Sequence, residues 1–149
     1  MQTYMLDTNV FNDALDRTIE LAPLTGGLLI VTGVQEDELR ATLDPNRRSD
    51  LLGVFTEIAP AVVAASSFCL DIAGAGLDEA HWNDGSGLFQ TMFCRLQVLS
   101  GHQEARRLNQ LRDIAIAETA IKNNAVLISR DRALRTVVLE HGGKAIPPA

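Results

Sequence analysis

Short apolar runs without polar alternation constrain the fold of this chain most strongly. Leu28–Thr32 follows Gly26 and Gly27 and is apolar up to its last residue, and Val126–Ser129 begins with Val-Leu-Ile. Strands that are buried on both faces have this pattern, whereas strands with one face in water alternate apolar and polar residues. Stretches with helical spacing separate these runs. The alternation predicts an α/β fold with a mainly parallel central sheet covered by helices on both faces.

The remaining elements follow from the same two periodicities. Further strands are expected at Thr3–Leu6, Ala61–Ala65 and Ala145–Ile146. Pro45 is expected to stop one helix and Ser49 to cap the next. Helices are expected at Asn12–Leu21, Gly33–Leu43, Ser49–Ile58, Leu88–Leu99, Leu111–Lys122 and Arg132–His141.

The length of the chain, 149 residues, fits a single domain over 1–149, in which 66–86 is expected to be a loop insertion. No apolar run reaches the roughly 18–20 residues that span a bilayer, and the N-terminus lacks the basic start of a signal peptide. We therefore expect a cytoplasmic protein without a membrane partner. Cys69 and Cys94 have apolar neighbours and are expected to be reduced, buried thiols.

Basic residues concentrate in the last third of the chain. Residues 101–149 contain eight basic and five acidic residues, whereas the first hundred contain five basic and fourteen acidic ones. The formal net charge of −6 argues against binding of nucleic acid over the whole surface. The basic C-terminal third is compatible with a local phosphate-binding face, and also with solvated helix surfaces.

Acidic residues are expected to gather at one edge of the sheet. Asp7 directly follows the first strand, and Asp131 follows the strand that ends at Ser129. Glu38 lies in the helix after the second strand, and Asp113 lies in the helix that leads into the late strand. Ligands of open parallel sheets bind beyond the carboxyl ends of the strands, so these acids are candidate functional residues. Each one alone could equally be a helix cap or a solvated residue.

Four carboxylates in one place would raise one another's pKa values unless cations neutralised them. Mg²⁺ and Mn²⁺ are suited to this task because they prefer oxygen ligands. One or two such ions can activate a water and stabilise the transition state of phosphodiester hydrolysis. The acids therefore favour metal-dependent hydrolysis that needs no Ser, Cys or His nucleophile.

The motifs around these acids resemble those of PIN-domain proteins, and in particular those of VapC-type toxins of toxin–antitoxin pairs. The matching segments run in the family's order over nearly the whole chain: Met5–Val10, Asp37–Arg40, Leu111–Ala117 and Val126–Arg132. The first and the last are the most specific. The resemblance implies a PIN-like three-layer α/β/α sandwich and an endoribonuclease that cuts RNA by Mg²⁺- or Mn²⁺-dependent hydrolysis.

The same resemblance assigns roles to individual residues and partners to the chain. Its partners would be RNA, an antitoxin protein and a second copy of the chain. Polar helpers of the carboxylates would be Asn9 and Ser129, with Thr8 a weaker candidate. The catalytic and metal-holding acids would be Asp7, Glu38, Asp113 and Asp131.

Four arginines flank the proposed site. They are candidates for gripping RNA phosphates through paired hydrogen bonds, and each could instead pair with a local acid. These arginines are Arg112, Arg130, Arg132 and Arg135.

Three departures from the family pattern leave choices open. Glu36 and Asp37 precede Glu38, which is preferred because Leu39 follows it. Glu118 is expected at the surface, since five residues turn a helix by about 140° from Asp113. Segment 66–86 does not match the short toxins, so a toxin and another PIN ribonuclease both stay open.

Two other classes of function are compatible with the chain. Asp7 could be the nucleophile of a phosphotransfer domain, but haloacid-dehalogenase-like enzymes have an acid where this chain has Asn9. Receiver domains have a late lysine where this chain has Arg130 and Arg132. A non-catalytic PIN-like module that binds RNA or protein is the second alternative.

A dimer face could be formed by the apolar residues Phe11, Leu21 and Leu24.

Overall fold

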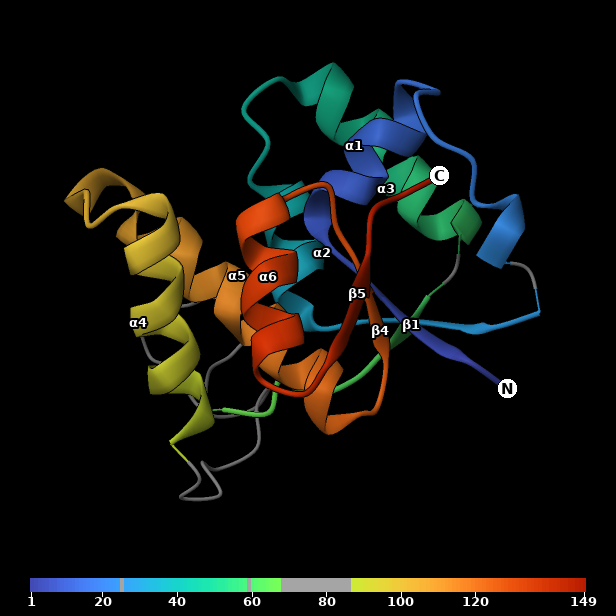
Figure 1. Cartoon of the computed structure of the whole chain (residues 1–149). Helices are drawn as coiled ribbons and strands as arrows, with labels where there is room; N and C mark the ends of the chain where they lie inside the picture. Colours follow the sequence, from blue (N-terminus) through green and yellow to red (C-terminus); the bar gives the residue numbers. More distant parts are fainter. Residues whose placement is uncertain (25, 59, 68–86) are drawn as a thin grey trace.

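A five-stranded parallel sheet organises the structure. The computed structural model describes residues 1–24, 26–58, 60–67 and 87–149 (Figure 1). The strands are β1 (Thr3–Leu6), β2 (Leu28–Val31), β3 (Ala61–Val62), β4 (Val126–Ile128) and β5 (Lys144–Ile146), and their order in the sheet is β3-β2-β1-β4-β5. Every neighbouring pair is parallel, so the prediction of a mainly parallel sheet is confirmed.

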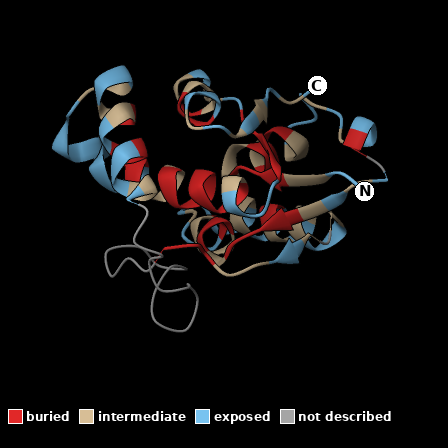
Figure 2. Ribbon diagram, turned by 60° about the horizontal axis from the view of Figure 1, so that its bottom comes forward, coloured by how far each residue is buried: buried red, intermediate tan, exposed pale blue. Residues whose placement is uncertain are grey.

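The helices are α1 (Thr8–Leu15), α2 (Gly33–Arg40), α3 (Pro45–Ile58), α4 (Leu88–Ser100), α5 (Glu104–Lys122) and α6 (Arg132–Glu140), with a short 3₁₀ helix at Ala22–Leu24. Residues of α1 and α3 pack against one face of the sheet, residues of α5 and α6 pack against the other, and α4 packs on α5 and α6. Side chains alternate between the two faces, since Met5 joins one core and Leu6 the other. The expected three-layer α/β/α sandwich is therefore confirmed, and its buried residues follow the strands and the inner sides of the helices (Figure 2).

Helix α1 begins earlier than the apolar spacing predicted. Asp7 caps it by accepting a hydrogen bond from the backbone N–H of Thr8 at 2.8 Å. The helix ends at Leu15, and Arg17 adopts a left-handed conformation with φ of 56°. The expected helix over Asn12–Leu21 is therefore displaced towards the N-terminus, because the polar cap outweighs the later apolar stripe.

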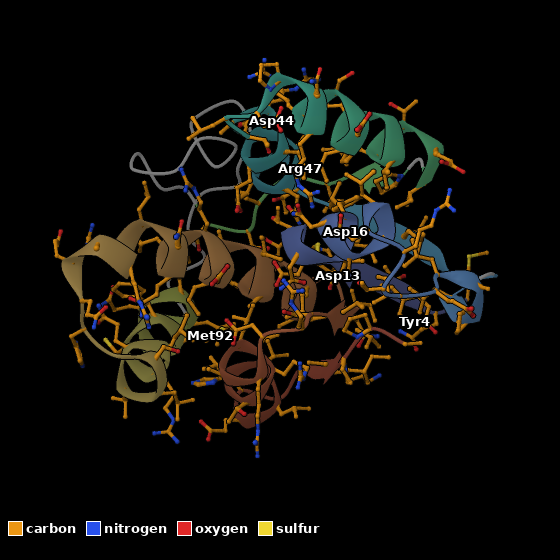
Figure 3. The ribbon with its side chains drawn as sticks, turned by 90° about the horizontal axis from the view of Figure 1, so that it is seen from above. Tyr4, Asp13, Asp16, Asp44, Arg47 and Met92 are labelled. Atoms are coloured by element: carbon orange, nitrogen blue, oxygen red, sulfur yellow. The ribbon has the colours of Figure 1, made fainter. Side chains whose placement is uncertain are left out.

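Helix α3 also begins earlier than expected, so the prediction that Ser49 caps it is wrong. The side chain of Asp44 accepts hydrogen bonds from the backbone of Asn46 at 2.9 Å and of Arg47 at 3.4 Å. Pro45 is the first helical residue, a position that tolerates proline because its missing N–H would be unpaired there. Arg47 then joins α3 to α1 through an ion pair with Asp16 at 3.0 Å (Figure 3).

Burial corrects three further expectations. Phe11 is completely buried and Leu24 is 9% exposed, so neither offers the exposed dimer face suggested for it. Glu118 is 1% exposed, so its expected place at the surface is wrong. Cys94 is exposed, which contradicts the expectation of a buried thiol. Cys69 and most of the expected insertion, residues 68–86, lie outside the described residues.

Helix α5 explains the burial of Glu118. Every residue from Ile114 to Ala120 is buried, because the helix has the sheet on one side and α4 packed against it on the other (Figure 1). The Oε2 atom of Glu118 lies 3.6 Å from the Nζ atom of Lys122. The amphipathic spacing rule assumes that one face of a helix is exposed to solvent, so it does not apply to a helix that is covered on both sides.

The chain has no described helix with the length and apolar content that crossing a bilayer requires.

Two glycine substitutions are expected to change stability in opposite directions. A Cβ atom at Gly143 would lie 2.7 Å from side-chain carbons of Ile121 and Val138, so Gly143→Ala should lower the free energy of unfolding by about 1–3 kcal/mol. Gly53 lies within α3 with nothing within 4 Å of the added carbon, so Gly53→Ala should raise the free energy by about 0.5–1 kcal/mol. Urea denaturation of both variants beside wild type measures the difference, and equal midpoints would contradict it.

Candidate functional site

The strand order places two of the predicted acids side by side. Leu6, the last residue of β1, pairs with Ile128, the last residue of β4. The backbone N–H of Asp7 donates to the carbonyl of Ile128 at 3.0 Å, so the chain leaves both strands at the same level. Asp7 is the N-cap of α1 and Asp131 is the N-cap of α6, and both helices follow adjacent strands.

A dense set of hydrogen bonds holds Asp7, which is 4% exposed. Its Oδ2 atom accepts from the hydroxyl of Ser129 at 2.5 Å and from the amide of Asn9 at 3.2 Å. The Ser129 hydroxyl in turn accepts from the backbone N–H of Asp131 at 3.1 Å. Burial raises the pKa of Asp7, while the bonds from Ser129 and Thr8 oppose this shift and the charge of Asp131 adds to it.

Glu38 reaches the site from helix α2. The capping box formed by Thr32 and Gln35 fixes the start of this helix directly after β2. The Thr8 hydroxyl donates to the Oε1 atom of Glu38 at 3.2 Å. Burial and then the charge of Asp7 raise the pKa of Glu38 to about 7.

Asp113 completes the acidic group from helix α5. Burial raises its pKa well above the ordinary value, and the charges of Asp7, Glu38 and Asp131 raise it further, in that order. Arg112 opposes this shift from the neighbouring position. The electrostatic coupling shows that the four carboxyl groups act on one another, although they come from four different parts of the chain.

A shared cavity of about 340 Å³ brings the predicted acids together. The predicted helpers Thr8 and Asn9 also line it. Glu36 instead forms an ion pair with Arg40 at 2.8 Å, which favours Glu38 among the crowded acids of α2. The acids that line the cavity are Asp7, Glu38, Asp113 and Asp131.

Sequence reasoning missed two further residues that line this cavity, Asn12 and Asn109. The sequence spacing between each of these residues and a predicted site residue could have identified it. Asn12 comes four residues after Thr8 in α1, and Asn109 comes four residues before Asp113 in α5. Residues four apart share one face of a helix, so each amide lies beside a residue already predicted for the site.

The donor set fits a hard divalent cation by its chemistry. Its members are carboxylate, amide and hydroxyl oxygens, which Mg²⁺ and Mn²⁺ prefer. Burial is the largest cause of the raised pKa values of Asp7, Glu38 and Asp113, and neighbouring acidic charge adds to it; a nearby cation would oppose these shifts. Within the described residues, no three acidic, histidine or cysteine side chains already stand close enough to hold an ion.

The flanking arginines have different surroundings. The Nη1 atom of Arg130 lies 2.6 Å from the Oδ1 atom of the buried Asp13, and Arg135 donates to the carbonyl of Ser129 at 2.7 Å. Both contacts brace the loop between β4 and α6. Arg112 donates to the side chain of Asn109 at 3.2 Å, and Arg132 is exposed at the start of α6.

Comparison with solved structures identifies the fold. A domain of a functionally unknown protein from Methanocaldococcus jannaschii matches with a TM-score of 0.54 and 15% identity, covering 100% of this chain and 92% of that one. A chain of VapBC2 from Rickettsia felis, solved with a DNA fragment from its promoter, matches with a TM-score of 0.53 and 14% identity, covering 99% and 100%. The chain has a PIN-like fold. Comparison with protein-family models and with curated proteins finds no match.

The PIN-like fold accounts for how distant parts of the sequence meet. The acids at the ends of β1 and β4 share an edge because these strands are neighbours, and α2 and α5 each bring one more acid to that edge. The resemblance inferred from four short motifs therefore agrees with the fold of the whole described chain.

Proposed function

We propose that this protein is a metal-dependent endoribonuclease that hydrolyses RNA phosphodiester bonds. The observation that supports this most directly is the convergence of four carboxylates on one cavity, three of them with raised pKa values. Surfaces that only bind RNA need positive charge, whereas this cavity concentrates negative charge. Such a cavity is suited to a divalent ion and, through it, to a phosphate.

Asp7, Glu38, Asp113 and Asp131 would hold Mg²⁺ or Mn²⁺. The bound ion would lower the pKa of a water and neutralise charge on the phosphate. The chain's own residues prepare this site. Ser129 and Asn9 fix Asp7 by hydrogen bonds, and the Ser129 hydroxyl also orients the backbone before Asp131. Thr8 positions Glu38 through its hydroxyl.

RNA would approach along the arginines beside the cavity. Arg132 is exposed, and the side chain of Arg130 is 64% exposed although it pairs with Asp13. Arg112 and Arg135 each donate a hydrogen bond from Nη1 to another residue of the chain. A guanidinium has further donors besides this nitrogen. These groups would supply charge-assisted hydrogen bonds to phosphates on either side of the cleaved bond.

The proposal extends to the partners of the chain. The likeness in fold to a chain of VapBC2 supports a role as the toxin of a toxin–antitoxin pair, with an antitoxin protein as partner. Such a toxin would act in the cytoplasm, where its RNA substrates are found, and would form a homodimer as the resemblance implies.

Purified protein is expected to cleave structured RNA with Mn²⁺ or Mg²⁺ and to lose this activity when excess chelator is added. Asp7→Asn should abolish cleavage, because the amide keeps the shape of the side chain but removes its charge. Gel analysis of end-labelled RNA measures both effects. Asp50→Asn, which changes an exposed acid of α3, is the matched control and should cleave like wild type.

Other results would change the assignment. Cleavage that survives both chelator and Asp7→Asn would contradict the metal mechanism. Metal binding without cleavage would indicate a narrow choice of RNA, and RNA or protein binding without metal binding would indicate a non-catalytic module. A phosphoryl group trapped on Asp7 would revive the phosphotransfer alternative.

A further inference from the structure

A second cavity adjoins the acidic one. It has a volume of about 540 Å³ and lies between α4, α5 and the start of α6. Asn109, Asp113 and Asp131 line both cavities. A molecule whose phosphate sits among the acids therefore has continuous space for a neighbouring group, in a volume typical of ligand-binding cavities.

One wall of the second cavity is apolar and comes from α4. Leu96 is 1% exposed and Leu99 is 40% exposed, so the wall is buried at Leu96 and open to solvent at Leu99. The acidic cavity is lined by polar side chains only. Apolar side chains beside polar groups suit a nucleobase, which has an apolar face and a hydrogen-bonding edge.

The opposite wall contains a buried amide with an unused acceptor. Gln110 is 5% exposed, and its Nε2 atom donates to the carbonyl of Gly101 at 2.9 Å. A carbonyl only accepts, so this bond fixes which end of the amide is the nitrogen. The Oε1 atom of Gln110 is buried and has no hydrogen-bond partner among the described residues. A buried acceptor without a donor is costly, and a ligand's amino group would satisfy it.

Arg106 adds positive charge to the same cavity. It donates from Nη1 to the carbonyl of Ser100 at 3.4 Å, a long bond that engages one of its several donors. Arg106 comes seven residues before Asp113 on α5, so the two residues lie about two helical turns apart along the same helix. That position suits the next phosphate along a nucleic-acid strand.

We propose that the second cavity binds the nucleotide next to the cleaved bond of a single-stranded RNA, an inference that rests on the proposed function. The base packs against Leu99 and presents an N–H donor to the Oε1 atom of Gln110, while Arg106 contacts the following phosphate. Adenine, cytosine and guanine carry an exocyclic amino group and uracil does not. Guanine and uracil also carry a ring N–H that can donate, so the Oε1 atom of Gln110 favours a base with a donor rather than one particular base.

Binding of short labelled single-stranded RNA tests the assignment separately from cleavage. The measurements use Asp7→Asn protein, which keeps the RNA intact, with oligomers of adenosine, cytidine or uridine and fluorescence anisotropy as readout. An abasic oligomer is expected to bind about tenfold more weakly than each of these three. Arg106→Ala should weaken binding of every oligomer about tenfold, and Arg107→Ala, at the adjacent exposed arginine outside the cavity, should change it little.

Two more variants test the base contacts. Leu99→Ser should weaken binding about fivefold, whereas Leu139→Ser at an exposed leucine of α6 should not. Gln110→Met keeps the size of the side chain but removes the acceptor, so it should weaken binding of all three oligomers. Its loss of the bond to Gly101 could unfold the protein, so circular dichroism checks each variant, and Arg106 and Leu99 carry the test independently of Gln110.

The outcomes separate the two proposals. Equal binding by Arg106→Ala, Leu99→Ser and their controls would overturn the second-cavity assignment even if wild type cleaves RNA. Weaker binding by those variants, in a protein that neither binds Mn²⁺ nor cleaves RNA, would support the cavity and overturn the nuclease. A wild-type protein that binds none of the oligomers would overturn the cavity assignment whatever the cleavage assay shows.

Discussion

Asp113→Asn is expected to slow RNA cleavage by about a thousandfold, which corresponds to about 4 kcal/mol of lost transition-state stabilisation. Asp113 is the acid whose pKa responds to all three of the other carboxylates, so its charge is central to the group. Removing that charge weakens the attraction for a divalent ion and with it the neutralisation of the phosphate. Single-turnover cleavage at saturating Mn²⁺ and calorimetric titration with Mn²⁺ measure the two effects.

Glu104→Gln is the matched control, because Glu104 is an exposed acid on the same helix. It should leave both measurements unchanged. The Asp113→Asn protein should also be more resistant to denaturation than wild type when metal is absent, since it lacks a carboxylate that its neighbours repel. Cleavage at the wild-type rate by Asp113→Asn would remove this residue from the proposed site.

The metal-free protein is expected to lose stability as the pH rises from about 4.5 to about 7, because Glu38 has an ordinary pKa of 4.5 and a folded-state pKa of about 7. Between these values the folded state holds a proton that the unfolded state has released, so the free energy of unfolding falls with rising pH. The full loss from Glu38, reached above pH 7, is about 3 kcal/mol. Glu38→Gln should remove the part of the loss that comes from Glu38 and leave the part that comes from Asp7 and Asp113, and chemical denaturation at pH 5 and pH 8 measures it.

Metal ions should reverse the effect in wild type. Mn²⁺ binds the charged carboxylates of the folded state, so its addition at pH 8 should raise the stability of wild type more than that of Glu38→Gln. Glu57→Gln, at an exposed position of α3, is the control and should follow the wild-type pH profile. A Glu38→Gln protein with the same pH profile as wild type would contradict the raised pKa.

The sequence predicted the layers and the acidic cavity because both depend on short-range patterns. Unbroken apolar runs marked the inner strands, and acids directly after those runs marked the edge where ligands bind. Glu38 was distinguished from Glu36 only by the leucine that follows it, and the structure gives this choice a physical basis through the Glu36–Arg40 ion pair. The order of the family motifs identified Asp113 as a site residue. Asp113 lies within a helix, so a search for acids at strand ends could not have identified it.

The errors came from features that a linear pattern does not contain. Asp44 caps α3 through its side chain, so this helix begins at Pro45 and not after the expected cap, Ser49. Glu118 is buried because α5 has neighbours on both sides, and helical spacing gives the angle between residues but not what covers each face. The second cavity depends on how α4 packs against α5, which no local signal in either helix reveals.

Asp7 and Asp131 each have two structural roles, and these roles constrain how the chain can change over evolutionary time. Each carboxylate caps a helix as well as lining the acidic cavity. Asparagine and serine cap helices nearly as well as aspartate, whereas alanine costs about 1 kcal/mol at such a position. A lineage that gave up catalysis would therefore be expected to drift to asparagine or serine at positions 7 and 131, while Glu38 and Asp113, which cap nothing, would be free to become apolar.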